Sequence, residues 1–240
     1  TFFETRIVIA GENGCVLYAA DVDHFQSGTL WDGPTEDWLE AATASPTLAV
    51  AVGDFGAIYT STNGAMWSRQ SNANENWLRG VACGEGTFVA VGRVGTVLLS
   101  TNGSSWSTRA IGITNHLNRV RYSAGRFTAV GDQGTFLVST NLGMTWSAEI
   151  TGATGGLENT CAGGADQLAA DQLVAGYGEV RIKEGSIWSD ELAKTNGPPD
   201  WTYFSAIGQP GFFLIAGQSG MQSEGYQTNG LPYFWLTPYD

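Results

Sequence analysis

The feature that most constrains the fold of this chain is a short segment that recurs along it. The segment reads S-T-N-G-A-M-W at 61–67, S-T-N-G-S-S-W at 100–106 and S-T-N-L-G-M-T-W at 139–146. An Asn side chain can accept backbone N–H groups two residues further on, and a nearby Gly supplies the positive φ that a tight turn requires. The Trp is then expected to pack back over the turn as the next strand begins. Its repetition predicts a chain built from similar units.

A second motif indicates the length of the unit. Glycines that open short turns lie 42, 39, 39, 45 and 41 residues apart, and an apolar run precedes nearly every one. These glycines are Gly11, Gly53, Gly92, Gly131, Gly176 and Gly217. A period near 40 residues with several short strands is typical of a β-propeller. We therefore expect residues 1–240 to form a single all-β domain, a six-bladed β-propeller of four-stranded antiparallel blades; a seven-bladed ring or part of a larger propeller is the alternative.

The other units contain degenerate copies of the segment. The copy in the first unit, at 19–25, has Asp in place of Asn and Phe in place of Trp, and further copies are expected at 183–188 and 227–233. The residues expected to build these turns are Phe25, Asn63, Trp67, Asn102, Trp106, Asn141, Trp146, Trp188, Asn229 and Tyr233. Longer connections are expected at 26–36, 151–171 and 190–200.

The segment at 139–146 fits the S-x-D-x-G-x-T-W Asp-box, the bacterial neuraminidase repeat, with Asn in place of Asp. The whole chain resembles an Asp-box propeller, and its rhythm is most similar to that of the photosystem II stability/assembly-factor-like propellers. In Asp-box propellers the box lies opposite the usual ligand face, so the resemblance implies that the boxes are structural. It says little about function, because such propellers include sialidases, other glycan-active enzymes, sorting receptors and assembly factors.

A candidate ligand face follows from the order of strands in a propeller. The segments that lead into the innermost strands and the turns between second and third strands share one face. That face would gather Trp38, Trp77, His116 and Trp201 with Glu12, Asp54, Phe55, Arg93, Asp132, Tyr177 and Gln218. Aromatic rings mixed with carboxylates and amides resemble a sugar-binding surface. The alternative is that the Trp rings pack between blades as core.

Charge and residue types exclude several functions. The net charge of −12, from 23 acidic against 11 basic residues, argues against nucleic acid as a partner. No apolar run approaches the length of a membrane span. Cys15, Cys83 and Cys161 fall in alternate units, so no disulfide is expected; with only two histidines, neither a metal site nor a cofactor is expected. The arginines Arg93, Arg119, Arg121 and Arg126 are interpreted as solvated surface side chains, with a local basic patch as the alternative.

A sialidase would require three arginines around a carboxylate, and Arg6-Ile7-Val8 only partly matches the family's R-I-P signature. We therefore expect a non-catalytic binding or assembly module, extracellular or periplasmic, that presents one face to a protein or glycan partner. The alternative is a carbohydrate-active enzyme, a glycoside hydrolase or polysaccharide lyase, with Asp54 and Asp132 as acid/base candidates.

Alignment of the units also predicts how the ring closes. Residues 1–11 align with 82–92, so about five inner-strand residues have no counterpart in the first unit. We expect a shortened inner strand in the first blade and a weak seam between the first and sixth blades. Unpaired strand edges at that seam would accept a partner chain.

Overall fold

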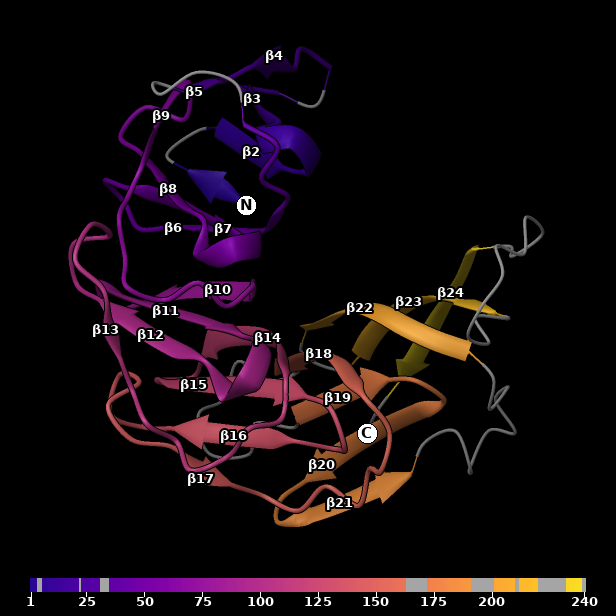
Figure 1. Cartoon of the computed structure of the whole chain (residues 1–240). Helices are drawn as coiled ribbons and strands as arrows, with labels where there is room; N and C mark the ends of the chain where they lie inside the picture. Colours follow the sequence, from indigo (N-terminus) through magenta and orange to yellow (C-terminus); the bar gives the residue numbers. More distant parts are fainter. Residues whose placement is uncertain are drawn as a thin grey trace.

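The computed structural model describes residues 1–3, 6–21, 23–30, 35–162, 172–190, 201–209, 212–219 and 232–238. In this part of the chain the regular structure consists of β-strands and three short 3-10 turns, η1 (Glu12–Gly14), η2 (Asp54–Gly56) and η3 (Arg93–Gly95). The strands form six sheets, which follow one another around a common centre in the order of the sequence (Figure 1). We call these sheets blades 1 to 6, and they correspond to the six repeat units.

The blades are meanders in which each strand pairs with the next. Blade 1 consists of β1 (Phe2–Phe3), β2 (Arg6–Ala10), β3 (Val16–Ala19) and β4 (Gln26–Ser27). Blade 2 consists of β6 (Leu39–Ala44), β7 (Ala49–Gly53), β8 (Ile58–Ser61) and β9 (Met66–Arg69). Blade 3 consists of β10 (Leu78–Gly84), β11 (Thr87–Gly92), β12 (Val97–Ser100) and β13 (Ser107–Thr108). Blade 4 consists of β14 (Leu117–Ser123), β15 (Arg126–Gly131), β16 (Phe136–Ser139) and β17 (Ser147–Ala148). Blade 5 consists of β18 (Leu157–Ala162), β19 (Gln172–Gly176), β20 (Glu179–Glu184) and β21 (Ile187–Asp190). Blade 6 shows β22 (Trp201–Gln209), β23 (Phe212–Ser219) and β24 (Pro232–Pro238).

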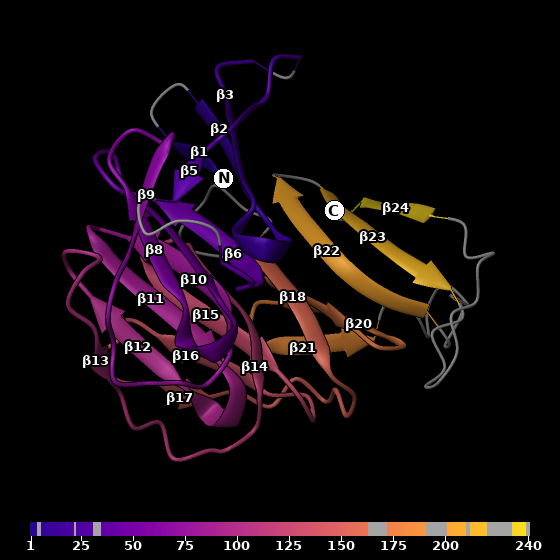
Figure 2. The same ribbon diagram turned by 45° about the horizontal axis from the view of Figure 1, so that its top comes forward.

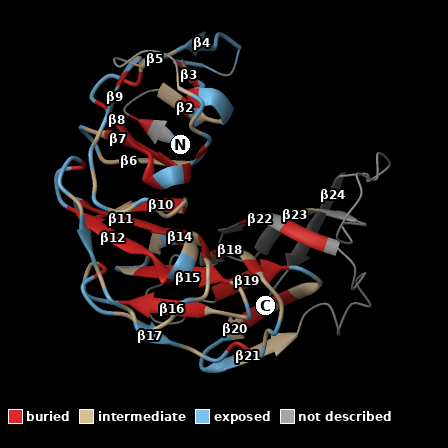
Figure 3. Ribbon diagram, in the orientation of Figure 1, coloured by how far each residue is buried: buried red, intermediate tan, exposed pale blue. Residues whose placement is uncertain are grey.

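The apolar core lies between neighbouring blades. β7 and β11 are buried on both sides, which explains why their sequences are apolar without alternation. Apolar clusters join blade 1 to 2, 2 to 3, 3 to 4, 4 to 5 and 5 to 6. Figure 3 shows the buried stretches concentrated in the inner and middle strands, with exposed turns around them.

Two of the expected long connections contain strands. β18 lies inside 151–171, so the prediction of a connection over that range is wrong in its first half; the polar residues of L-E-N-T-C-A concealed the strand. The range 26–36 contains β4 and β5 (Thr29–Leu30), and β5 pairs in parallel with β9 on the outer edge of blade 2. β5 therefore covers a strand edge that would otherwise be unpaired. The range 191–200 lies outside the described residues.

A β-bulge recurs in the innermost strands of blades 2 to 6. In each strand the residue that pairs with the turn glycine is followed by one residue without a partner, as where Leu78 pairs with Gly92 and Gly80 with Val91. These extra residues are Glu40, Arg79, Asn118, Glu158 and Phe204. A bulge re-aims the side chain that it carries, and four of these five are polar.

Blade 1 differs from the others at its inner edge. β1 pairs through Phe2 with Ile7 and Phe3 with Arg6, and Thr1 exchanges two backbone hydrogen bonds with Val8, both at 2.7 Å, so the inner strand is short, as expected. Beyond this pairing Ile9 is 46% exposed. Inner strands of neighbouring blades contact one another from blade 1 through blade 6, but among the described residues no contact of similar extent joins β22 to β1 or β2. Figure 2 shows β2 of blade 1 and β22 of blade 6 on either side of the seam between these two blades.

Candidate binding face

The Asn-containing turns are built as the sequence predicts. Asn63 Oδ1 accepts the N–H groups of Ala65 and Met66, both at 2.9 Å, and Trp67 Nε1 donates to the carbonyl of Gly64 at 2.8 Å. The turns around Asn102 and Asn141 repeat this pattern, including the Trp106 and Trp146 bonds to the turn glycine. We call these turns boxes and the face that carries them the box face.

Each box contacts the blade before its own. A Cβ on Gly64 of blade 2 would meet Val8 and Phe3 of blade 1, and one on Gly103 of blade 3 would meet Leu48 of blade 2. Trp67 is fully buried in the cluster between blades 1 and 2. These contacts give the boxes a structural role at the blade interfaces.

The degenerate boxes follow the pattern only in part. In blade 1 the Asp21 carboxylate accepts the N–H groups of Asp23 and His24, but Phe25 is 39% exposed and does not pack as Trp67 does. In blade 5 the ring of Trp188 packs edge-on against Phe136 of blade 4, with centroids 5.2 Å apart. Asn229 lies outside the described residues, and of Tyr233 only its place in β24, opposite Gly217, is described.

The opposite face carries the turns that begin at the glycines, and we call it the glycine-turn face. In blades 2 to 5 each of these turns bonds to the segment that leads into the same blade, so the two do share one face as expected. The N–H donors and carbonyl acceptors are Asp54 to Trp38 (3.0 Å), Arg93 to Trp77 (2.9 Å), Asp132 to His116 (2.9 Å) and Tyr177 to Gly156 (2.9 Å). The approach requires glycine, since a Cβ on Gly53 would lie 1.9 Å from the Trp38 oxygen.

Trp201 does not occupy the position of the other Trp residues. Tyr203 pairs with Gly217 as Leu78 pairs with Gly92, so Thr202 is the counterpart of Trp77 and Trp201 precedes it by one residue. The sequence alignment was wrong by one position there, because Tyr replaces the usual Leu. Gln218 pairs with Thr202, and the side chains of Trp201 and Gln218 are not among those described.

Several of the predicted rings are exposed on the glycine-turn face. Phe55 is 63% exposed, Trp38 49% and Tyr177 43%, whereas Trp77 and His116 are half-buried. The core alternative is therefore wrong for Trp38. The Arg93 guanidinium lies 3.7 Å from the centroid of the Trp77 ring, a cation–π contact. The Phe55 and Trp77 rings pack edge-on, with their centroids 5.9 Å apart, so Phe55, Trp77 and Arg93 form one group of contacting side chains.

The turns hold these side chains in a strained backbone conformation. Phe55 and Val94 have φ values of 48° and 55°, in the left-handed region that non-glycine residues rarely adopt. The conformation costs about 1–3 kcal/mol at each residue. The Val94 N–H donates to His116 Nδ1 at 3.0 Å, which ties the turn of blade 3 to blade 4.

The two carboxylates considered as an acid/base pair have other roles. Asp54 is buried, and its carboxylate accepts the Trp38 N–H at 2.7 Å within blade 2. Asp132 accepts from Asn118 Nδ2 at 3.3 Å within blade 4. Both carboxylates are thus engaged in the structure of their own blades. Glu12, another residue predicted for this face, is exposed at the turn of blade 1.

The polar bulge residues form a network between the inner strands. Arg79 donates to Asn118 Oδ1, and Asn118 Nδ2 donates to the Leu157 carbonyl at 3.0 Å and to Glu158 at 3.4 Å. Burial raises the pKa of Glu158, and Asp132 raises it further, while Arg79 lowers it. Sequence reasoning missed this network, although a polar residue directly after the shared leucine of four units was a usable signal.

Arg119 and Arg121 lie beside this network and line a central cavity of about 250 Å³. Burial lowers the pKa of both guanidinium groups; Arg121 lowers that of Arg119 further, and Glu158 and Glu40 act in the opposite direction. Arg119 is half-buried in the cavity wall, whereas Arg121 is exposed. The surface interpretation is therefore wrong for Arg119 but fits Arg121, and the four arginines do not form one patch: Arg93 lies on Trp77 and Arg126 bonds to Gln172.

The described residues contain no group of three His, Cys, Asp or Glu side chains that could hold a metal ion. Cys15, Cys83 and Cys161 are free thiols, and burial raises the pKa of Cys161 to about 12, so this thiol stays protonated at neutral pH. No helix in the described ranges is long and apolar enough to cross a membrane.

Meandering blades around a central cavity, with the boxes on one face and the glycine turns on the other, define a β-propeller. Neither the scan of protein families nor the search of curated proteins finds a match. Solved structures do match. YCF48 from Cyanidioschyzon merolae has a TM-score of 0.66 and 16% identity, covering 90% of this chain and 75% of that one.

Two further structures also match this chain. A structure of YCF48 bound to D1 peptide has a TM-score of 0.55 and 13% identity, over 90% of this chain and 86% of that one. An ancestral GH74 enzyme has a TM-score of 0.62 and 12% identity, over 99% of this chain and 39% of that one. At these identities the similarity establishes the propeller fold alone.

Proposed function

We propose that this protein is a non-catalytic binding module that holds a polypeptide partner on its glycine-turn face. The observation that carries the proposal is the group formed by the exposed Phe55 ring and the half-buried Trp77 and Arg93, with the exposed Trp38 on the lead-in segment of blade 2. Tyr, Trp and Arg side chains contribute a large share of the binding energy at protein interfaces.

The group is organised before any partner arrives. The turn bond from Arg93 to Trp77 and the bond from Val94 to His116 fix the backbone on which the rings stand. A surface that is already ordered loses less conformational entropy on binding.

A polypeptide is favoured over a glycan for this surface by two considerations. One similar propeller has been solved with a bound peptide, which supports a peptide partner here by analogy. The carboxylate of Asp54 is engaged with Trp38, which weakens the glycoside hydrolase or lyase alternative. The proposal includes the assignment of the boxes to the Asp-box type and an extracellular or periplasmic location, both on the sequence arguments given above.

A peptide library displayed on phage tests the proposal. Peptides are selected on the immobilised wild-type chain and then measured against two variants. Phe55→Ser with Trp38→Ser removes two exposed rings of the glycine-turn face, whereas Met66→Ser with Met144→Ser removes two exposed side chains of the box face. We expect selected peptides to bind wild type and the box-face variant alike and to lose on the order of tenfold or more affinity for the other variant.

Two outcomes would overturn the proposal. One is a library that yields no binding peptide, and the other is a set of peptides that bind all three proteins equally. A reducing-sugar release assay on plant and bacterial polysaccharides, run beside the selection, tests the enzyme alternative directly.

The seam between blades 1 and 6 is a second part of the proposal. The inner pairing of β2 ends at Val8, which bonds to Thr1, and Ile9 is exposed beyond it. We propose that an extended strand from a partner chain pairs there, because an open strand edge offers unpaired backbone groups.

A further inference from the structure

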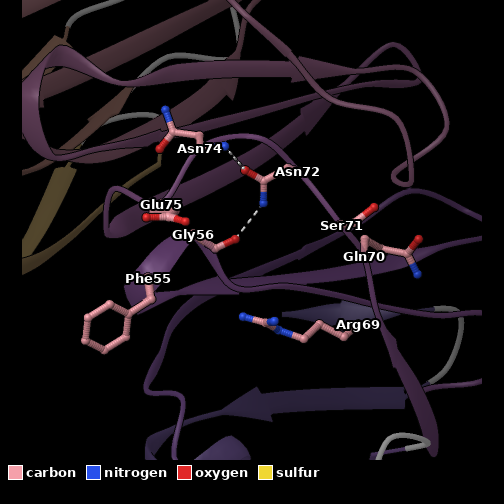
Figure 4. Close-up of a pocket in the computed structure, with 8 residues that line it drawn as sticks. All are labelled: Phe55, Gly56, Arg69, Gln70, Ser71, Asn72, Asn74 and Glu75. Carbon is pink, nitrogen blue, oxygen red and sulfur yellow. Dashed lines mark hydrogen bonds between the residues drawn. The ribbon is translucent and has the colours of Figure 1, made fainter.

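We infer that the junction of blades 2 and 3 contains a site that binds one neutral sugar unit and shares the Phe55 ring with the proposed peptide-binding group. The site is a pocket of about 300 Å³ between η2, the end of β9 and the segment that leads to β10. The groups that could bind a ligand are the Phe55 ring, the Arg69 guanidinium and the Glu75 carboxylate, all three of which line the pocket. Figure 4 shows Arg69 and Glu75 on either side of Gly56, with the Phe55 ring directed away from Arg69. Small-molecule pockets span about 300–1,000 Å³, so this volume suits a single ring.

The wall of the pocket is held in place without a ligand. Asn72 Nδ2 donates to the Gly56 carbonyl at 2.7 Å, and Asn72 Oδ1 accepts the Asn74 N–H at 2.8 Å (Figure 4). Asn74 Oδ1 in turn accepts the Asn76 N–H at 2.8 Å. Gln70 turns away from the opening and bonds to Thr60 at 2.9 Å. The polar groups of Asn72, Asn74 and Gln70 are therefore engaged in hydrogen bonds within the protein, and ligand binding would depend on other side chains of the pocket.

Two charged groups remain available to a ligand. Arg69 is fixed by its Nε, 3.5 Å from Asp37 Oδ2, and its side chain is 48% exposed. Asp37 also accepts the Tyr59 hydroxyl at 2.8 Å, which holds the carboxylate in place. Glu75 is exposed and makes neither a hydrogen bond nor an ion pair with any described residue. The pocket therefore offers N–H donors on one wall, carboxylate acceptors on the other and the exposed Phe55 ring beside them.

This combination selects among ligand classes. Asp37 balances the charge of Arg69, so Glu75 leaves the pocket slightly acidic and unfavourable to an anion. A simple cation would be repelled by the positive charge of the Arg69 guanidinium. A neutral sugar satisfies all three groups: its hydroxyls donate to Glu75 and accept from Arg69, and its C–H face packs against Phe55.

Saturation-transfer NMR tests the inference on the full chain. The probes are the methyl glycosides of glucose, galactose, mannose and xylose, with methyl glucuronide as the anionic comparison. We expect at least one neutral glycoside to bind the wild type, and methyl glucuronide to bind more weakly. Glu75→Ala should weaken the binding about tenfold, since hydrogen bonds to a charged acceptor are among the stronger ones.

The matched control is Glu184→Ala, an exposed glutamate at the end of β20 in blade 5. It removes the same charge from the chain and should leave glycoside binding unchanged. The inference is overturned when no neutral glycoside shows transfer, when Glu75→Ala and Glu184→Ala bind equally, or when methyl glucuronide binds more tightly than methyl glucoside. Circular dichroism of both variants establishes that each is folded before binding is compared.

Discussion

The carboxylate of Asp54 accepts the backbone N–H of Trp38 at 2.7 Å, and the Asp54 N–H donates to the Trp38 carbonyl at 3.0 Å. This reciprocal pair locks the turn of blade 2 to its lead-in segment, with the carboxylate buried. The residue is therefore a structural part of the face on which Trp38 is displayed.

Replacement of Asp54 tests this role. Asp54→Ala leaves the Trp38 N–H without its side-chain acceptor and should reduce the free energy of unfolding by about 1–3 kcal/mol, measured by urea denaturation. Asp54→Asn keeps an acceptor oxygen and should cost less. Equal stability of wild type and Asp54→Ala would show that the bond contributes nothing.

Trp67 should be the most sensitive residue of the boxes. Its ring is fully buried between blades 1 and 2, so Trp67→Ala creates a cavity and should cost about 3–5 kcal/mol of unfolding free energy. Trp67→Phe fills part of the space and should cost less. Peptide binding by the folded fraction should persist, because the box face lies opposite the proposed binding face; loss of binding in a stable variant would reverse the assignment.

Val94 should be a site where a substitution stabilises the chain. Its φ of 55° is unfavourable for a β-branched residue and is acceptable to glycine. Val94→Gly should raise the free energy of unfolding by about 1 kcal/mol, which thermal denaturation detects as a higher Tm. Val94→Ala keeps most of the strain and should change stability less. A lower Tm for Val94→Gly than for Val94→Ala would contradict the strain argument.

Glu158 should make stability depend on pH. Burial raises its pKa in the folded protein, so the folded state holds the proton more tightly than the unfolded state does. The contribution of Glu158 to the free energy of unfolding is fully present below the pKa of an unfolded glutamate, about 4.3. It is lost as the pH rises through the higher pKa of Glu158 in the folded protein. Urea denaturation across this range should show that Glu158→Gln flattens the pH dependence relative to wild type. An unchanged slope in the variant would assign the dependence to other groups.

The seam should exchange amide hydrogens faster than the middle of the ring. Amides in 7–18 and 226–236 are predicted to exchange faster than those in 88–99, since the inner pairing of β2 ends at Val8; of the second range, 226–231 lie outside the described residues. Hydrogen exchange read by mass spectrometry measures this difference. Equal protection across the units would mean that the seam needs no partner.

The repeat made much of the fold predictable. Turn glycines and Asn boxes are local signals, so the sequence showed both motifs and their period. The bulge was not visible, because an extra residue in one strand shows only against its partner. This explains why Arg119 was placed on the surface: after the bulge, the alternation that decides which side chains face inward is shifted by one residue. The same dependence on pairing explains the error of one position at Trp201, because only the pairing of Tyr203 with Gly217 shows where β22 aligns with the other inner strands.

The Asn boxes of blades 2, 3 and 4 each rest on the blade that precedes them, whereas the glycine turn of blade 3 bonds to the blade that follows, through Val94 and His116. A newly synthesised blade can dock on the preceding blade as soon as its own box forms, and its glycine turn gains further bonds when the next blade is made. Such a molecule can fold in the order in which it is synthesised. It can also lengthen by duplication of its last unit without redesign of the earlier ones, because each unit brings the contacts for its own attachment.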